Sequence, residues 1–181
     1  NIILIIFIFL TNGIKADSEN QIIDNLQKGG NLIFIRHAYA PGGGDPVNFD
    51  INDCSTQRNL SDMGRAQSKK IGTFFKKNKI PINLVISSEW CRCKETALIA
   101  FNNFETKNFL NSFYSKKFTK NKKIQMKNLE KYVDNWEGHK NLVLVTHYVV
   151  ISEAINYAAN SGEIVIADQN FKKIGSVEIN Y

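Results

Sequence analysis

Two histidines and two arginines occupy positions in the chain from which their side chains could hold an anion. Arg36 and His37 follow one apolar run, and His147 follows a second run. Arg92 lies in the first turn of a predicted helix, and helix N-termini favour anions because unpaired N–H groups and the helix dipole point at them. Two imidazoles and two guanidiniums at such positions predict a pocket for a dianionic phosphoryl group.

Short apolar runs should position these side chains. The runs cover residues 32–35, 83–87 and 141–146, and runs of this length are typical of strands buried in a parallel sheet. Ligands of open α/β sheets bind beyond the carboxyl ends of the strands. The polar residues that follow the three runs should therefore meet at one edge of a sheet.

Helical patterns separate the predicted strands. Apolar residues recur at helical spacing in 18–28, in a segment that Ser61 would cap, after Arg92, and in 149–159. Two final strands, 163–167 and 174–179, read as a hairpin at the sheet edge. The sequence thus predicts an α/β fold, a three-layer α/β/α sandwich with a mainly parallel central sheet and helices on both faces.

The composition suits one globular domain, which we place at residues 17–181. The chain has 181 residues, is 43% apolar and 22% charged, and carries a net charge of +6. Seven lysines fall within 115–131, where we expect a solvated helix face or, alternatively, a surface that attracts anionic substrates. No aromatic–basic motif accompanies them, so nucleic acid is not an expected partner. The sequence predicts no oligomeric state.

Residues 1–16 resemble the apolar and cleavage regions of a secretory signal peptide, with its N-terminal part missing. A nine-residue apolar run, 2–10, precedes Ile14-Lys15-Ala16. The run is too short to span a bilayer comfortably, although a buried N-terminal strand would have the same pattern. We expect a secreted or periplasmic protein that begins near Asp17 and has no stable membrane anchor after cleavage.

Three cysteines allow one disulfide in an oxidising compartment. Cys91 and Cys93 are too close to pair at a helix start, so Cys54 should pair with Cys91 or with Cys93. A zinc site is not expected, because Cys-x-Cys lacks a second pair of ligands.

Four stretches together resemble the histidine phosphatase superfamily, which has the phosphoglycerate mutase-like fold. They occur in the order of the family's motifs: 35–38 is similar to its Arg-His-Gly signature, 60–64 to its Leu-Ser/Thr-x-x-Gly helix opening, 87–96 to its Ser-Ser-Pro-x-x-Arg-x-x-x-Thr stretch, and 145–147 to its second histidine. The stretches 53–61 and 90–93 look most like an exported bacterial subgroup.

The resemblance implies a metal-independent phosphatase without a cofactor, acting on a small phosphorylated anion. His37 would attack phosphorus in line and become a phosphohistidine, which water then hydrolyses. Neighbouring cations lower the pKa of an imidazole and keep it neutral and nucleophilic. Arg36 and Arg92 would hold the phosphoryl oxygens, His147 would add a fourth contact, and Arg58 is a possible further contact to substrate.

The chain departs from the family pattern at several positions. Ala38 replaces a glycine and Glu89 replaces a proline. The region where many members carry the general acid, 110–113, has no carboxylate. Its absence favours substrates with good leaving groups, such as phosphoramidates or acyl and anhydride phosphates, and argues against mutase activity. The nearby carboxylates are Asp45, Asp50, Asp53 and Glu89, of which Asp53 and Glu89 are the candidates for the acid. The alternatives are a phospholigand-binding module without turnover and a phosphomutase or phosphotransferase.

Overall fold

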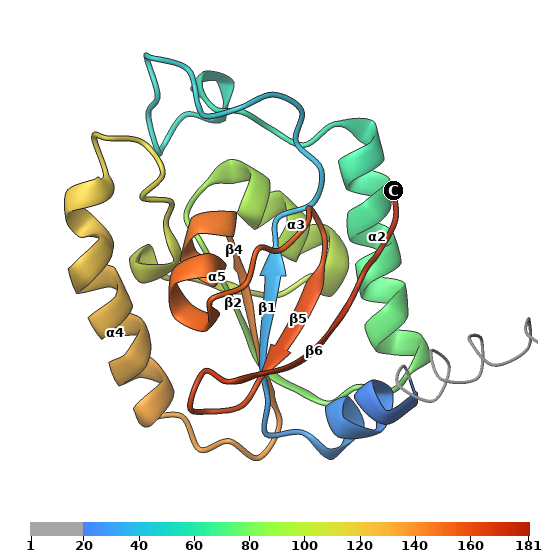
Figure 1. Ribbon diagram of the computed structural model, residues 1–181. Coiled ribbons are helices and arrows are strands. Elements are labelled where there is room, and N and C mark those ends of the chain that lie inside the picture. Colours follow the sequence, from blue (N-terminus) through green and yellow to red (C-terminus); the bar gives the residue numbers. More distant parts are fainter. Residues whose placement is uncertain (1–19) are drawn as a thin grey trace, which may run out of the picture.

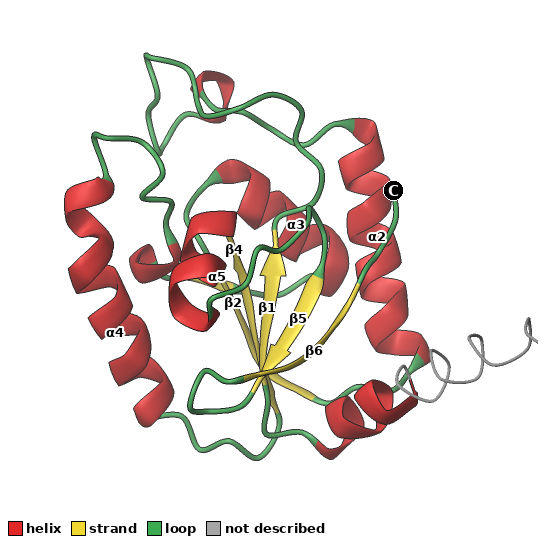
Figure 2. Ribbon diagram, in the orientation of Figure 1, coloured by secondary structure: helices red, strands yellow, loops and turns green. Residues whose placement is uncertain are grey.

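A computed structural model describes residues 20–181, which fold around a six-stranded sheet with helices on both faces (Figure 1, Figure 2). The strands are β1 (Leu32–Arg36), β2 (Ile82–Ser87), β3 (Glu105–Thr106), β4 (Asn141–Thr146), β5 (Ile164–Ala167) and β6 (Lys173–Val177). The longer helices are one over residues 20–28, α2 (Asp62–Lys77), α3 (Cys91–Phe101), α4 (Lys122–Asp134) and α5 (Tyr148–Ile155). Three short 3₁₀ turns are η1 (Cys54–Thr56), η2 (Asn108–Leu110) and η3 (Thr119–Asn121).

The sheet is mainly parallel, as the alternation of strands and helices predicts. Its strand order is β3-β2-β4-β1-β5-β6. The first four strands of that order run parallel to one another, whereas β5 is antiparallel to β1 and to β6. The predicted hairpin of the last two strands is therefore confirmed, and β6 forms one edge of the sheet.

The strand residues alternate between two cores, because successive side chains of a strand point to opposite faces. Phe34 and Leu144 face one layer, which is formed by α4, α5 and η2. Ile33 and Val143 face the other layer, which is formed by the helix over 20–28, α2 and α3. The predicted three-layer α/β/α sandwich is confirmed, and Figure 1 shows the helices on the two sides of the sheet.

The start of α2 fixes the chain that leaves β1. The hydroxyl of Ser61 accepts a hydrogen bond from the backbone N–H of Gly64, as expected of an N-cap. A Cβ at Gly64 would lie 2.1 Å from the backbone oxygen of Tyr39, so only glycine allows the two segments to approach this closely. The segment after His37 is thereby held against the helix.

The lysine-rich segment differs from the helix expected across 115–131. Residues 115–121 form turns and η3, and α4 begins only at Lys122. Phe118 accounts for the difference, because its ring packs in a T-shape against Trp90 and Phe49 on the neighbouring loop. The lysines 116, 117, 120, 123, 127 and 131 are exposed.

The predicted signal peptide, 1–16, lies outside the described residues. Within 20–181, no helix combines the length and the hydropathy needed to cross a bilayer.

Candidate active site

Parallel pairing brings the predicted site residues together at the carboxyl ends of the central strands. Arg36 of β1 is the register partner of Thr146 of β4, and the N–H of His37 donates to the oxygen of Thr146 at 2.9 Å. On the other side of β4, the chain leaving β2 is fixed by the N–H of Ser88, which donates to the oxygen of Val145. The start of α3 therefore lies beside the two histidines.

A pocket of about 510 Å³ opens at this edge of the sheet. All five predicted basic residues line it, namely Arg36, His37, Arg58, Arg92 and His147. Its outer wall includes aromatic side chains and the exposed Lys117. Of the described residues that line the pocket, Asp45 alone carries a carboxylate.

His37 presents one ring nitrogen for chemistry. Its Nδ1 lies 2.8 Å from the backbone oxygen of Ala38. A carbonyl oxygen only accepts hydrogen bonds, so the neutral ring carries its proton on Nδ1 and its lone pair on Nε2. The side chain is 2% exposed, and burial together with the charge of Arg92 lowers its pKa well below 6.5. His37 is a neutral imidazole near pH 7.

His147 has the opposite tautomer because of a chain of hydrogen bonds. The side-chain oxygen Oδ1 of Asn111 accepts a hydrogen bond from the backbone N–H of Glu89. An amide oxygen can only accept, so the hydroxyl of Ser88, 3.0 Å away, must donate its proton to the same oxygen. The same hydroxyl then accepts from Nε2 of His147 at 2.8 Å. Nδ1 of His147 is left as an acceptor, 3.5 Å from Nη2 of Arg92.

The two histidines lie in one electrostatic environment, with ring centroids 5.5 Å apart. Burial lowers the pKa of His147 well below 6.5, and the charges of Arg92 and of a protonated His37 would add to this effect. Both rings are neutral when the pocket holds no anion. A dianionic ligand beside His147 would oppose these effects and raise its pKa.

Arg92 is bound to a carboxylate that the sequence-based assignment of the site omitted. The guanidinium is 3% exposed and donates from Nη1 to Oδ1 of Asp45 at 2.7 Å and from Nη2 to Oδ2 at 3.2 Å. Burial opposes ionisation of Asp45, but the hydrogen bonds and charge of Arg92 outweigh it and keep the pKa of this carboxyl below its usual range. Asp45 is therefore ionised at neutral pH.

Arg36 and Arg58 are each held by backbone oxygens. Nη1 of Arg36 donates to the oxygen of Ala159 at 2.9 Å, and its buried Nε has no partner in the described structure. Arg58 donates from Nε to the oxygen of Gly44 at 2.9 Å and from Nη1 to the oxygen of Ala40. Both guanidiniums are fixed at the pocket wall and keep further N–H donors for a ligand.

The structure does not bring the two predicted acid candidates into the pocket. Asp53 is exposed and caps η1, where its Oδ1 accepts from the N–H and hydroxyl of Ser55. Glu89 accepts from Nδ2 of Asn111 at 2.6 Å and lines an adjacent hollow. Asp53 is thus corrected to a capping residue, because its side chain is used in its own turn. The sequence signal for Asp45 is its position after three glycines, which predicts a loop that can approach the site.

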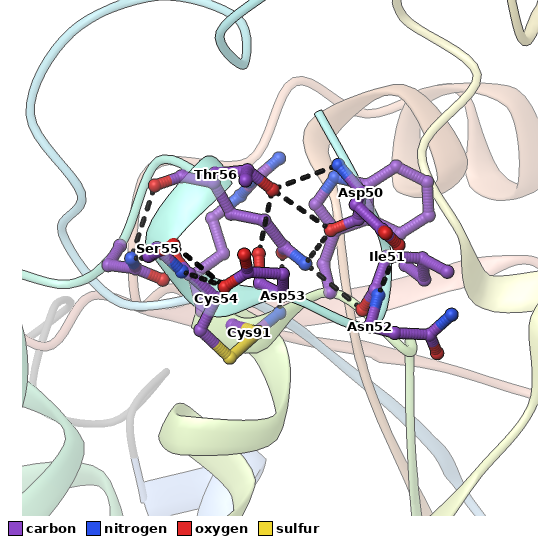
Figure 3. The surroundings of a disulfide bond; sticks show 12 residues. Asp50, Ile51, Asn52, Asp53, Cys54, Ser55, Thr56 and Cys91 are labelled. Atoms are coloured by element: carbon purple, nitrogen blue, oxygen red, sulfur yellow. Dashed lines mark hydrogen bonds between the residues drawn. A yellow bond between two sulfur atoms is a disulfide. The ribbon is translucent and has the colours of Figure 1, made fainter. Parts of the chain in front are cut away.

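A disulfide joins the loop over the pocket to the helix that carries Arg92. Cys54 pairs with Cys91, with Cα atoms 5.7 Å apart, and Figure 3 shows the hydrogen-bonded turn of residues 50–56 that presents Cys54 to the start of α3. The side chain of Gln57 adds a second link, because its Oε1 accepts from the N–H of Cys91. Of the two predicted pairings, the structure has Cys54 with Cys91.

Cys93 keeps a free, buried thiol, 3.5 Å from Nε2 of His147. Burial raises its pKa to about 12, so the thiol stays protonated and is a poor nucleophile. Among residues 20–181, no group of three His, Cys, Asp or Glu side chains is arranged to bind a metal ion.

Comparisons with known proteins identify the fold. No protein-family model matches the chain, and no curated protein sequence matches it. Solved structures do: the protein histidine phosphatase SixA complexed with tungstate has a TM-score of 0.55 and 15% identity, covering 79% of this chain and 92% of SixA. A phosphoglycerate mutase from Thermus thermophilus has a TM-score of 0.57 and 13% identity, covering 83% and 99%. The open reading frame Rv3214 of Mycobacterium tuberculosis has a TM-score of 0.57 and 14% identity, covering 83% and 96%.

Proposed function

We propose that the protein is a histidine phosphatase that hydrolyses a phosphomonoester or phosphoramidate without a metal ion, through a phosphohistidine on His37. The observation that carries this proposal is the pocket itself, where a buried neutral imidazole with a free Nε2 faces three guanidiniums. The fold shared with SixA and with phosphoglycerate mutase supports the same reaction class. The tungstate bound in SixA supports a tetrahedral oxyanion as ligand.

In the first step, Nε2 of His37 attacks phosphorus while the bond to the leaving group breaks in line. Nδ1 stays hydrogen-bonded to the oxygen of Ala38, which orients the ring and stabilises the positive charge that it develops. Arg36 and Arg92 bind the non-bridging oxygens, whose charge they neutralise throughout the transfer. The products are a phosphohistidine and the leaving group, which departs with the electron pair of the broken bond and takes its proton from solvent water.

His147 responds to the bound ligand. A phosphoryl dianion raises the pKa of this imidazole, so that Nδ1 gains a proton and donates to a phosphoryl oxygen. The bond from Nε2 to Ser88 keeps the ring in place during this change. In the second step, water attacks the phosphohistidine in line, the P–N bond breaks, and phosphate and neutral His37 are regenerated.

The carboxylates of the described residues restrict the substrate. Asp45, the pocket carboxylate, is ionised and bound to Arg92, so it carries no proton for the leaving group in this arrangement. Substrates with good leaving groups, including phosphoramidates, therefore suit the site better than sugar phosphates, and mutase chemistry suits it poorly.

We also propose that the protein is exported and that the mature chain begins near Asp17. The disulfide supports this proposal, since such bonds persist in oxidising compartments. Mass spectrometry of the native protein tests it, and a soluble form that retains residues 1–16 would contradict it.

Pre-steady-state kinetics with 4-nitrophenyl phosphate tests the proposed function. We expect a burst of nitrophenol equal to the enzyme concentration, followed by steady turnover in the presence of a chelator. His37→Ala should abolish both, whereas replacing the exposed His139 by alanine should change neither. Binding of the ester without release of nitrophenol would indicate a binding module, and transfer to an added alcohol in preference to water would indicate a phosphotransferase.

A further inference from the structure

In the part of the chain that the structure describes, the terminal nitrogens of Arg92 have no free donor. Nη1 donates to Asp45 at 2.7 Å and to the backbone oxygen of Arg58 at 3.3 Å. Nη2 donates to Asp45 at 3.2 Å and points its second hydrogen at Nδ1 of His147. The remaining donor, Nε, is buried without a partner among the described residues. A phosphoryl group cannot bind the Nη pair while Asp45 occupies it.

We propose that Asp45 is a resident counter-ion of the phosphoryl site, which the incoming phosphoryl group displaces from Arg92, and that this exchange selects dianionic phosphomonoesters over monoanionic esters. The inference rests on the proposed function in one respect, namely that the ligand is the phosphoryl group of that substrate.

The hydrogen bonds of Asp45 give the exchange its selectivity. Oδ1 accepts from Arg92 and from the N–H of Arg58, and Oδ2 accepts from Arg92 and from Nε1 of Trp90 at 3.1 Å. Hydrogen bonds between charged groups are the strong ones. A monoanionic ligand would have to break the hydrogen bonds of Asp45 and would bring only the same single negative charge to Arg92. A dianion brings one more negative charge to the same donors, so its attraction to them is stronger.

The charges around the pocket match a dianion. Apart from the exposed Lys117, the charged residues that line it are Arg36, Arg58, Arg92 and Asp45, and both histidines are neutral. Three guanidiniums and one carboxylate leave an excess of two positive charges. Removing the carboxylate charge would leave an excess of three and would favour any anion.

The glycine segment beside Asp45 has open space around it, whereas the far end of the loop is anchored. Gly42 and Gly44 have φ values of +87° and +72°, which other residues rarely adopt, and a Cβ at Gly43 or Gly44 would meet no atom within 4 Å. The far end of the loop is held by the disulfide of Cys54. In the proposal, Asp45 leaves Arg92 by rotation of the glycine segment, which also breaks the hydrogen bond from Nε of Arg58 to the oxygen of Gly44.

Two ligands of the same shape and different charge test the proposal. Phenylphosphonate is a dianion at pH 8, benzenesulfonate is a monoanion, and neither is hydrolysed. By calorimetry, the unmodified protein should bind phenylphosphonate at least about tenfold more tightly than benzenesulfonate. Asp45→Asn should bind benzenesulfonate roughly tenfold more tightly than the unmodified protein does and should lose most of the discrimination.

The matched control is Asp50→Asn, which removes the same charge from an exposed position of the same loop. It should leave both affinities unchanged. If Asp45→Asn keeps the discrimination, or weakens both ligands, Asp45 positions Arg92 without leaving it and the proposal is wrong. Circular dichroism and the melting temperature show whether the Asp45→Asn variant is folded. If Asp45→Asn does not fold, Asp45→Ser replaces it in the experiment, with the same expected result.

Trp90 reports the displacement directly, because its indole N–H loses Asp45 as acceptor. In a Trp136→Phe background, Trp90 is the remaining tryptophan. Phenylphosphonate should change the fluorescence emission of Trp90 when Asp45 is present, and should change it little in the Asp45→Asn variant. An emission that does not respond to saturating ligand would contradict displacement. A different result would contradict the proposed function and leave the displacement of Asp45 standing. In that case no phosphohistidine forms on His37, although both ligands still compete with Asp45 for Arg92.

Discussion

At the scale of single residues, the two pocket histidines differ from ordinary ones in their affinity for protons. Burial and Arg92 lower the pKa of His37 well below 6.5, so the ring remains neutral in mildly acidic solution, as the proposed role of nucleophile requires. We expect the acid limb of kcat/KM to lie below pH 6.5, as measured with an aryl phosphate at constant ionic strength. A limb at or above pH 6.5 would show that His37 is solvated in the free enzyme.

The same shift makes stability depend on pH. Below pH 6.5 the unfolded chain binds protons on His37 and His147 that the folded chain does not bind, so the free energy of unfolding falls as the pH falls. The contribution of the neutral pair is fully present above pH 6.5. Urea midpoints measured between pH 5 and 7.5 should decrease toward pH 5, and His37→Asn should make this decrease smaller. If the urea midpoint of His37→Asn decreases as much as that of the unmodified protein, groups other than His37 cause the decrease.

Arg92 should not tolerate lysine, although the charge is kept. A lysine cannot present two parallel N–H donors to a phosphoryl group or to Asp45. Loss of one charge-assisted hydrogen bond costs about 1.5–3 kcal/mol, which is about one to two decades in kcat/KM. The loss should persist at high salt. Arg65→Lys, in the first turn of α2 and outside the pocket, is the control and should be nearly silent. A silent Arg92→Lys would contradict the role of this guanidinium.

The sequence identified Arg36, His37, Arg92 and His147 because each lies at the end of a buried run or opens a helix. It could not identify Asp45, since nothing in a local pattern shows which of four nearby carboxylates reaches Arg92 across the pocket. That contact joins residues 47 positions apart. The tautomer of His147 likewise depends on Ser88 and Asn111, which come from different elements.

At the scale of elements, the loop over residues 45–57 is held to α3 at several points. The disulfide joins residues 37 positions apart, and a cross-link of this span stabilises the folded chain by about 3–4 kcal/mol in the chain-entropy model. Cys54→Ser should lower the melting temperature, and reduction should have the same effect. Activity should fall with it, because the loop that carries Asp45 and leads into Arg58 is released. An unchanged melting temperature after complete reduction would contradict the tether.

The elements themselves follow the sequence wherever the pattern is long. Buried strands of apolar residues, the Ser61 cap and the final hairpin were predictable, because burial and capping act locally. The start of α4 was not, since the stacking of Phe49 on Trp90 and the packing of Phe118 beside them decide where the chain can become helical. These contacts form only once the loop is in place.

At the scale of the whole molecule, the net charge of +6 and the exposed lysines of 116–131 should attract anionic substrates from a distance. Replacing Lys116, Lys117 and Lys120 by glutamine should lower kcat/KM at low salt. The difference should fade near 1 M salt, where the Debye length is about 3 Å. A difference that persists at high salt would indicate direct contact, most simply by Lys117 at the pocket rim. Three glutamines at Lys69, Lys70 and Lys76 of α2 are the control for charge alone.

The proposed function depends most directly on a covalent bond between phosphorus and His37. Enzyme mixed with ³²P-labelled aryl phosphate and quenched within the burst should carry about one phosphate per chain, in an acid-labile and base-stable form. Peptide mapping should place it on His37, with none on His37→Ala. Steady turnover without phosphate on the protein, or with phosphate on another residue, would contradict the proposed function.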